Sequence, residues 1–128
     1  MYGFKIFSYT ESAIAFIISG GTILPILSAF CPHLPVSLKS SGSDCILLII
    51  AALNGSQADE IYDEAIKKDL SVIVEVHDQK EAETALKYKD ALIGINNRNL
   101  KTLEISINNT ISIFETLKSH QSPIISES

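Results

Sequence analysis

Residues 45–126 contain short apolar runs, and a polar or amphipathic stretch long enough for a helix separates each run from the next. This alternation constrains the fold more than any other feature, because strands connected by helices become parallel strands with right-handed crossovers. The expected strands are residues 45–50, 71–76, 91–95 and 123–126. The expected helices are residues 56–68, a short helix after Asp78, and a helix over about residues 107–117.

The first two apolar runs differ in their pattern. Residues 45–50, CILLII, show no alternation, which favours a strand covered on both faces. In residues 71–76, SVIVEV, a period of two places Ile73, Glu75 and His77 on one face and the valines on the other. The second strand is therefore expected to carry an acidic side chain, Glu75, on the face opposite its valines.

Capping signals mark where the helices are expected to begin. Ser56 and Asp59 have capping-box spacing, and Asp78 with Glu81 repeats it with Asp in place of Ser. Asn108 is the expected cap of the last helix. The residues expected to form the apolar stripes are Ala58, Ile61, Tyr62, Ala65 and Ile66 in the first helix, Ala82, Ala85 and Leu86 in the second, and Ile107, Ile111, Phe114 and Leu117 in the third.

Composition limits the class of protein. The 128 residues correspond to one domain or part of one, and 46% are hydrophobic, which is typical of a globular chain. The net charge is −5 and no basic run exceeds two residues, so nucleic acid is not an expected partner. Cys31 and Cys45 lack the spacing of a metal site, and they favour a reducing compartment with buried thiols and no disulfide.

Residues 1–40 do not share the regular alternation. Residues 13–18 and 22–27 can form strands joined by a turn at Gly20-Gly21, residues 1–7 can form another strand, and residues 31–35 are an expected loop because two prolines interrupt them. Residues 12–38 carry no Asp, Glu, Lys or Arg. This stretch is long enough to span a membrane, which takes about 20 apolar residues. Glycine, proline and serine interrupt it, so we favour a soluble segment over a membrane anchor or an export signal.

Polar side chains follow two of the expected strands. Glu75 and His77 end one strand, and Asn96, Asn97 and Arg98 follow the next. The carboxyl ends of parallel strands are where α/β folds build their sites, and a partly buried carboxylate there suits acid–base chemistry. Alternatively, Glu75 is a strand-end residue that reaches water, and the second cluster is an ordinary loop in which Arg98 pairs with Glu104. For His77, which has no ligand partner at metal spacing, we expect a structural role.

Four segments together resemble indole-3-glycerol-phosphate synthase, a (β/α)8-barrel family of tryptophan biosynthesis. They are residues 43–53, 70–78, 90–104 and 124–128, and within them IGINNRNL (93–100) is specific for this family. The resemblance covers about residues 38–128 and corresponds to the fourth to seventh barrel strands. It implies a partial TIM barrel of the α/β class: a half-barrel over residues 38–128, preceded by a poorly matched apolar leader over residues 1–37.

The family's activity implies a carbon–carbon lyase. Its members close the ring of 1-(2-carboxyphenylamino)-1-deoxyribulose 5-phosphate with loss of carbon dioxide and water, in the cytoplasm and without cofactor or metal. By matching positions, Glu75 resembles the acid–base carboxylate, Asn96 the substrate-orienting amide and Glu127 the carboxylate of the seventh strand. The positions that resemble substrate-binding residues are Arg98 on the anionic side, Ser128 on the phosphate side, and Leu47 and Leu100 against the aromatic ring.

Other family features are absent from this sequence. The lysines of the family's first strands have no counterpart, since Lys5 and Lys39 lack the matching neighbours, and the glycine-rich phosphate turns do not occur. The chain is therefore expected to be inactive or nearly so alone. An alternative is a non-catalytic half-barrel that pairs with a chain supplying the missing strands. Another phosphate-binding barrel, such as phosphoribosylanthranilate isomerase, is less favoured because that family lacks the IGINNRNL block.

Overall fold

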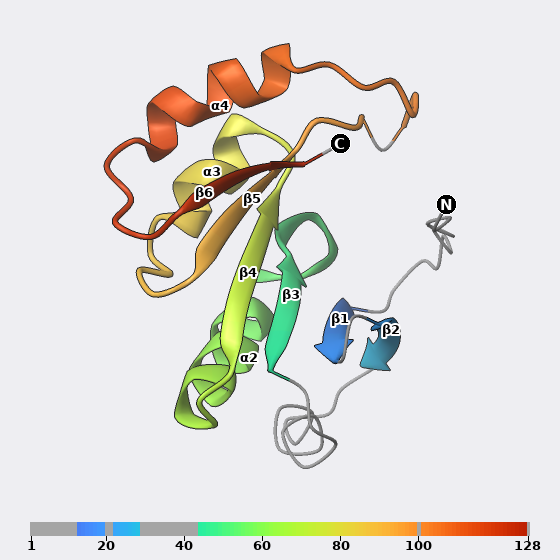
Figure 1. The fold of residues 1–128 in the computed structure, drawn as a ribbon, viewed down its shortest axis with the longest axis vertical. Coiled ribbons are helices and arrows are strands. Elements are labelled where there is room, and N and C mark those ends of the chain that lie inside the picture. Colours follow the sequence, from blue (N-terminus) through green and yellow to red (C-terminus); the bar gives the residue numbers. More distant parts are fainter. Residues whose placement is uncertain (1–12, 20–21, 29–43, 100, 128) are drawn as a thin grey trace.

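The structure is a computed structural model that describes residues 13–19, 22–28, 44–99 and 101–127. Its strands form one six-stranded sheet in the order β2-β1-β3-β4-β5-β6 (Figure 1). The strands are β1 (Ala13–Ser19), β2 (Thr22–Ser28), β3 (Cys45–Ile49), β4 (Ser71–Val76), β5 (Leu92–Asn96) and β6 (Ile124–Glu127). The helices are the 3-10 turn η1 (Ile50–Ala52), α2 (Gly55–Lys67), α3 (Gln79–Ala85) and α4 (Asn108–Leu117).

Strands β3 to β6 are parallel, and each pairs with the next strand in the chain. Helices α2, α3 and α4 lie in the three connections. Sequential parallel order with one helix per crossover is the arrangement of a (β/α) barrel, whereas doubly wound sheets reverse their strand order. The prediction of a partial α/β barrel is confirmed, with strand bounds that differ from the expected ones by at most one residue.

The two expected strands near the N-terminus are also present. β1 and β2 pair in antiparallel fashion, and β1 pairs antiparallel with β3, so these strands extend the sheet beyond β3 (Figure 1). The expected strand over residues 1–7 and the expected loop over residues 31–35 lie outside the described residues. Among the helices that the structure describes, none is long and apolar enough to cross a membrane.

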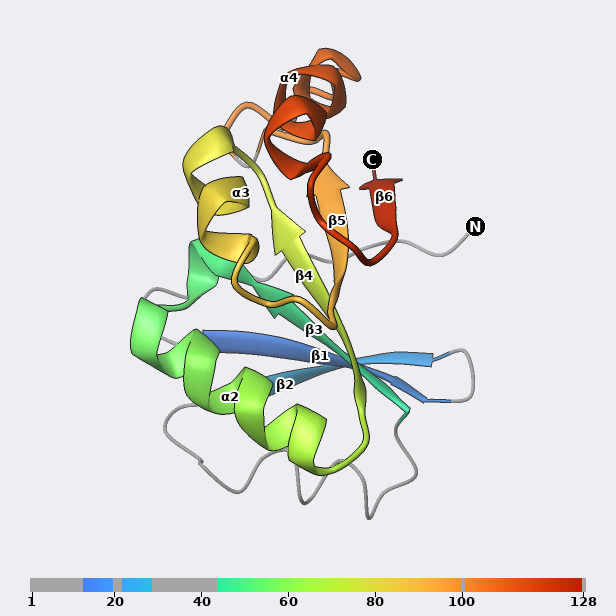
Figure 2. The ribbon, with the colours of Figure 1, turned by 90° about the vertical axis from the view of Figure 1, so that its left-hand side faces the viewer.

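The hydrophobic core lies between one face of the sheet and the helices (Figure 2). The valines of β4 are at most 1% exposed, which confirms the face predicted from the period of two. The strand side chains buried on this face are Ile46, Leu48, Val72, Val74, Val76, Ile93 and Ile95. This face holds the strands in register and so determines which side chains reach the opposite face.

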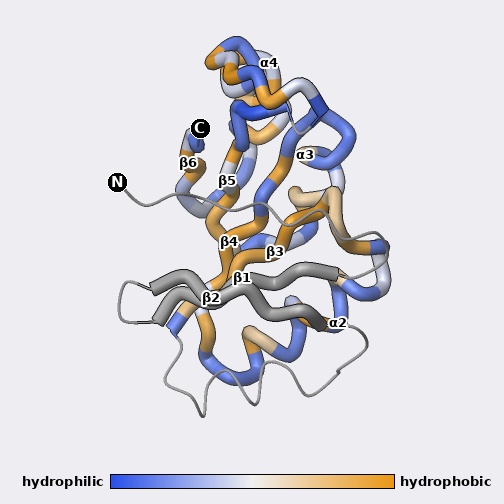
Figure 3. Tube along the Cα trace, turned by 90° about the vertical axis from the view of Figure 1, so that its right-hand side faces the viewer, coloured by the Kyte–Doolittle hydropathy of each residue, from blue (hydrophilic) through white to orange (hydrophobic). Residues whose placement is uncertain are grey.

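The opposite face of β3 is less covered than its apolar run predicts. Cys45, Leu47 and Ile49 are half-buried, whereas Ile46 and Leu48 are fully buried. The helices lie on one side of the sheet, and Figure 3, seen from the other side, shows the hydrophobic residues of β3 and β4 in orange. The prediction of full cover on both faces is wrong, because the described strands form an open sheet and not a closed barrel.

Helix α2 begins earlier than its capping signal suggested. Its N-cap is Asn54, whose Oδ1 accepts the Gln57 N–H at 2.9 Å, while the Gln57 side chain accepts the Asn54 N–H. Ser56 donates its hydroxyl to the same Asn54 oxygen. The Ser56–Asp59 prediction is therefore wrong: Asn54, which also ends the preceding turn, starts the helix two residues sooner.

We expect Asn54→Ala to lower the free energy of unfolding by about 1 kcal/mol, because it removes the Oδ1 atom that accepts the Gln57 N–H and the Ser56 hydroxyl. Ser56→Ala, the matched control, removes one exposed hydroxyl and should cost less than about 0.5 kcal/mol. Urea unfolding of the two variants measures the difference. A larger loss for Ser56→Ala than for Asn54→Ala would contradict this assignment of the cap.

Helix α4 packs with a face that shares only Leu117 with the apolar stripe predicted for it. Ile113 and Leu117 are buried, whereas Ile107, Ile111 and Phe114 are 59%, 63% and 45% exposed. The rotation follows from polar contacts at the start of the helix. Asn109 Nδ2 donates to the backbone oxygens of His77 and Asn96, and the Thr110 N–H donates to Asn97 Oδ1. Positions 109, 110, 113 and 117 lie on one helical face, so these contacts turn the Ile107–Ile111–Phe114 stripe outward.

Candidate active site

The register of the parallel strands places polar side chains together at their carboxyl ends. Glu75 in β4 lies beside Gly94 in β5, and Asn96 in β5 lies beside Glu127 in β6. Asn96 Nδ2 donates to Glu75 Oε1 at 3.0 Å, and Glu75 is only 7% exposed. Three of the residues predicted as catalytic from the sequence therefore meet at one edge of the sheet.

Asn96 is oriented by its own loop. The Arg98 backbone N–H donates to Asn96 Oδ1 at 2.8 Å, so the other end of the amide, Nδ2, faces Glu75. The Arg98 guanidinium extends away, with Nη1 at 3.5 Å from the Leu103 oxygen. The alternative that Arg98 pairs with Glu104 is wrong, because no such ion pair occurs within residues 44–99 and 101–127.

Glu127 occupies space that a glycine leaves open. A Cβ atom at position 94 would overlap the Glu127 Oε1 atom, so Gly94 allows this carboxyl to lie against the β5 backbone. Burial raises the pKa of Glu127, the Glu75 carboxylate raises it further, and His77 opposes both. A glycine within a strand signals such a close approach, and this signal in the sequence was missed.

We expect Gly94→Ala to swing the Glu127 side chain out of this position, because its flexible end, and not backbone, fills the space of the new methyl group. The pKa of Glu127 should then fall towards its usual 4.5 as burial and the influence of Glu75 weaken. Carbon-detected NMR titration of the Glu127 carboxyl measures this change. If the pKa of Glu127 remained raised in Gly94→Ala, the position of the Glu127 carboxyl against Gly94 would not be the cause of its raised pKa.

His77 lies next to this cluster, on the same face as Glu75. Its Nε2 is 3.0 Å from Glu75 Oε1, without the angle of a hydrogen bond, and its Nδ1 is 3.2 Å from Glu81 Oε2. Burial acts to lower the pKa of His77, but the contacts with Glu75 and Glu81 outweigh it and raise the pKa to about 9. A structural role at the strand end was expected for His77 from the sequence, and the structure places its ring between Glu75 and Glu81.

Asn97 forms a buried hydrogen-bond network that connects the carboxyl end of β5 to β6 and to the start of α4. Its Nδ2 donates to Ser126 Oγ at 2.9 Å and to the Glu127 backbone oxygen at 2.6 Å, and its Oδ1 accepts from the Thr110 N–H and hydroxyl. Asn97 thus caps α4 from a distance, which replaces the predicted cap Asn108. The sequence placed Asn97 in a polar loop but gave no sign of partners 13 and 30 positions away.

The other predicted substrate-binding positions are Leu47, Leu100 and Ser128. Leu47 is half-buried on the same sheet face as Glu75, consistent with access from the side of the candidate site. Leu100 and Ser128 lie outside the described residues. Within the described ranges, no group of three or more His, Cys, Asp or Glu side chains is arranged to hold a metal ion.

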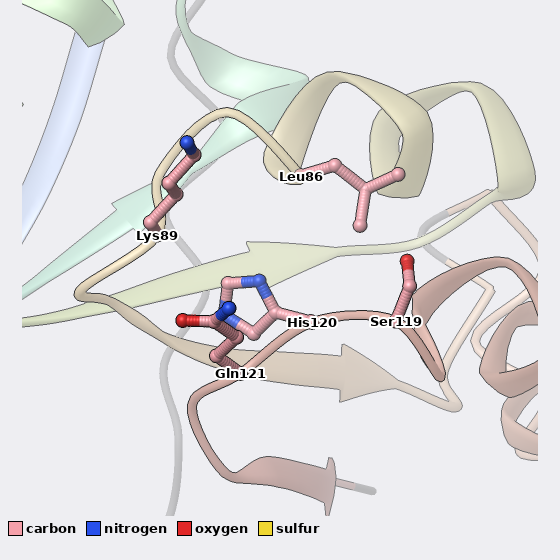
Figure 4. Close-up of a pocket in the computed structure, with 5 residues that line it drawn as sticks. All are labelled: Leu86, Lys89, Ser119, His120 and Gln121. Atoms are coloured by element: carbon pink, nitrogen blue, oxygen red, sulfur yellow. The ribbon is translucent and has the colours of Figure 1, made fainter.

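A surface pocket of about 250 Å³ lies at the other end of the strands (Figure 4). Leu86, Lys89, Ser119, His120 and Gln121 line it, in the segments that lead into β5 and β6. His120 Nε2 lies 2.9 Å from the Ala91 oxygen, just before the amino end of β5. Glu75 and Asn96, in contrast, lie at the carboxyl ends of their strands. We place the candidate site at the carboxyl ends, where the titratable groups converge, and not in this pocket.

Comparison with known proteins identifies the family of this chain. The sequence pattern of the family described as indole-3-glycerol phosphate synthase matches residues 36–128. Among curated relatives, the indole-3-glycerol phosphate synthases of a Polaromonas species, Bacillus cereus and Azospirillum brasilense are 53%, 47% and 49% identical to this chain over 72, 88 and 79 residues. These matches cover 56%, 69% and 62% of this chain and 27%, 35% and 30% of the relatives.

The chain thus spans about a third of the length of the curated relatives that it matches. The matched family residues 36–128 include β3 to β6 and every described residue of the candidate site. Because the family pattern covers more than half of the sequence, this chain belongs to the indole-3-glycerol phosphate synthase family.

Proposed function

We propose that this chain supplies part of the active site of an indole-3-glycerol phosphate synthase. The reaction is the decarboxylating and dehydrating closure of 1-(2-carboxyphenylamino)-1-deoxyribulose 5-phosphate. The observation that carries the proposal is the hydrogen-bonded Glu75–Asn96 pair with Glu127 beside it, inside the family-matched residues. The proposed unit begins near residue 38, after the leader of residues 1–37, and acts in the cytoplasm.

Each residue has a proposed role that its surroundings support. Glu75 exchanges a proton with the substrate during dehydration, since a carboxyl group 7% exposed is shielded from bulk water. Asn96 orients the substrate through the amide that the Arg98 backbone fixes. Glu127, whose pKa is raised by burial and by Glu75, is a second carboxyl that can carry a proton nearer neutral pH.

Substrate binding is proposed for the flanking positions. Leu47 contacts the aromatic ring from the half-buried face of β3. The Arg98 guanidinium is assigned to the anionic side of the substrate, Leu100 to the ring and Ser128 to the phosphate side, as the resemblance to the family implies. A phosphorylated small molecule is the proposed ligand, and the chain's own side chains, without cofactor or metal, carry the proposed chemistry.

Growth of a tryptophan-requiring strain tests this proposal. We define the hybrid enzyme as the Bacillus cereus relative in which residues 36–128 of this chain replace the segment that they match. The hybrid enzyme should restore growth without tryptophan in a bacterium that lacks its own synthase. A stable, expressed hybrid that gives no growth would contradict the proposal, and the unmodified relative is the positive control.

A second candidate function is a half-barrel subunit that works only with a partner chain. The observation that favours it is the apolar surface formed by Ile107, just before α4, and by Ile111 and Phe114 of α4, each at least 45% exposed. Strand β6 also has no neighbour on its outer side among the described strands, and such an edge can pair with another chain. Mixing this chain with a chain that carries the other barrel strands should then produce synthase activity that neither has alone, and no gain would exclude this candidate.

A further inference from the structure

His77 connects the start of helix α3 to the tip of β4. Both its backbone N–H and its ring Nδ1 face one oxygen, Oε2 of Glu81, at 2.8 and 3.2 Å. Because Asp78 caps α3 by accepting the Glu81 N–H, the Glu81 backbone is fixed as well. The imidazole is therefore held in one orientation by a residue that lies outside the candidate site.

The other side of the ring faces the site. Nε2 is buried and lies 3.0 Å from Glu75 Oε1, the same oxygen that accepts the Asn96 amide. A carboxylate oxygen only accepts hydrogen bonds, and carboxylate oxygens lie against both ring nitrogens. An imidazolium ring, which carries a proton on each nitrogen, is the form that suits both contacts.

The charged groups around this ring come from three elements. Glu75 faces it from β4, Glu81 from α3, and Glu127 acts on it from β6. From helix α4, the neutral Asn109 donates its Nδ2 to the His77 backbone oxygen. The ring thus lies among three carboxyl groups, and it is closest to the one proposed to exchange protons.

We propose that His77 is a positioning residue: its ring, fixed by Glu81, holds the Glu75 carboxyl group in place against Asn96. Glu81, His77, Glu75 and Asn96 form one continuous series of contacts from α3 to β5. The inference rests on the proposed role of Glu75. Neither the family match nor the sequence pattern assigned this role to His77, for which only a structural role was expected.

Nuclear magnetic resonance of the full 128-residue chain tests this role without any substrate. In the unmodified chain at pH 7.5, both ring nitrogens of His77 should have the chemical shifts of an imidazolium, and the ring should titrate near pH 9. Glu81→Gln and Glu75→Gln should each lower this pKa by about one unit or more. Glu83→Gln, on the same helix but exposed, is the matched control and should leave it unchanged.

The Asn96 side-chain amide distinguishes positioning from simple structural support. Its resonance should follow the His77 titration in the unmodified chain and should lose that pH dependence in His77→Gln, because Glu75 no longer responds to the ring. A His77 that titrates near its usual 6.5, or an Asn96 resonance that His77→Gln leaves unchanged, would overturn the inference. These readouts involve no turnover, so they can succeed or fail independently of the proposed synthase activity.

Discussion

Glu75→Gln should lower kcat/KM of the hybrid enzyme by about 10²–10⁴-fold, the range that general acid–base catalysis contributes. Glutamine preserves the size of the side chain and one oxygen. This oxygen can accept the hydrogen bond that Asn96 Nδ2 donates to Glu75 Oε1, at 3.0 Å, in the unmodified chain. It removes the group that exchanges a proton. The loss should therefore appear in kcat, with KM changed much less, because the ground-state contacts to substrate remain.

Glu83→Gln is the control for this variant, because it removes the same charge from an exposed position of α3. It should leave kcat/KM within a factor of about two, in line with the small effect of an exposed surface substitution. Steady-state rates of indole-3-glycerol phosphate formation give both values. If Glu75→Gln retained full activity, the carboxyl of β4 would be a strand-end residue and not the proton-exchanging group.

Asn97→Ala should lower the free energy of unfolding by about 3 kcal/mol, the largest stability effect that we expect from one polar residue here. Asn97 is 7% exposed, and its amide joins β5 to β6 and to the start of α4. Alanine would leave the Thr110 N–H at the helix start without this acceptor, and would leave the Glu127 backbone oxygen with one donor fewer. Urea unfolding measures the loss.

Asn108→Ala provides the comparison for Asn97→Ala. Asn108 is exposed and is the first residue of α4, where the sequence predicted a cap. Since Asn97 serves the helix start instead, Asn108→Ala should change the free energy of unfolding by less than about 0.5 kcal/mol. A larger loss for Asn108→Ala than for Asn97→Ala would show that the helix is capped locally and that the remote network contributes little.

The sequence predicted what depends on local patterns. The period of two in β4 separated the buried valines from Glu75 and His77, and Asp78 caps α3 as its spacing with Glu81 predicted. Parallel pairing then brings the strand ends together, so Glu75 and Asn96 could be assigned to one site before their hydrogen bond was known. These features follow from backbone geometry and need no information on distant contacts.

The features that were missed depend on partners far apart in the sequence. The apolar stripe Ile107–Ile111–Phe114 gave the wrong face for α4, because Asn109 and Thr110 bind the ends of the strands and rotate the helix. In α2, Asn54 is the cap where Ser56 was predicted, and propensity alone does not rank Asn against Ser at a helix N-cap. Tertiary polar contacts determine which face of a helix packs, and hydrophobic periodicity does not predict these contacts.

Rates of product formation by the purified hybrid enzyme test the central claim most directly, which is that this chain provides a working Glu75–Asn96–Glu127 edge to a synthase site. The account predicts that the hybrid enzyme converts 1-(2-carboxyphenylamino)-1-deoxyribulose 5-phosphate to indole-3-glycerol phosphate, and that Glu75→Gln removes nearly all of this activity. A folded hybrid enzyme with no product formation, or one whose rate is the same with and without the Glu75 carboxyl, would contradict it.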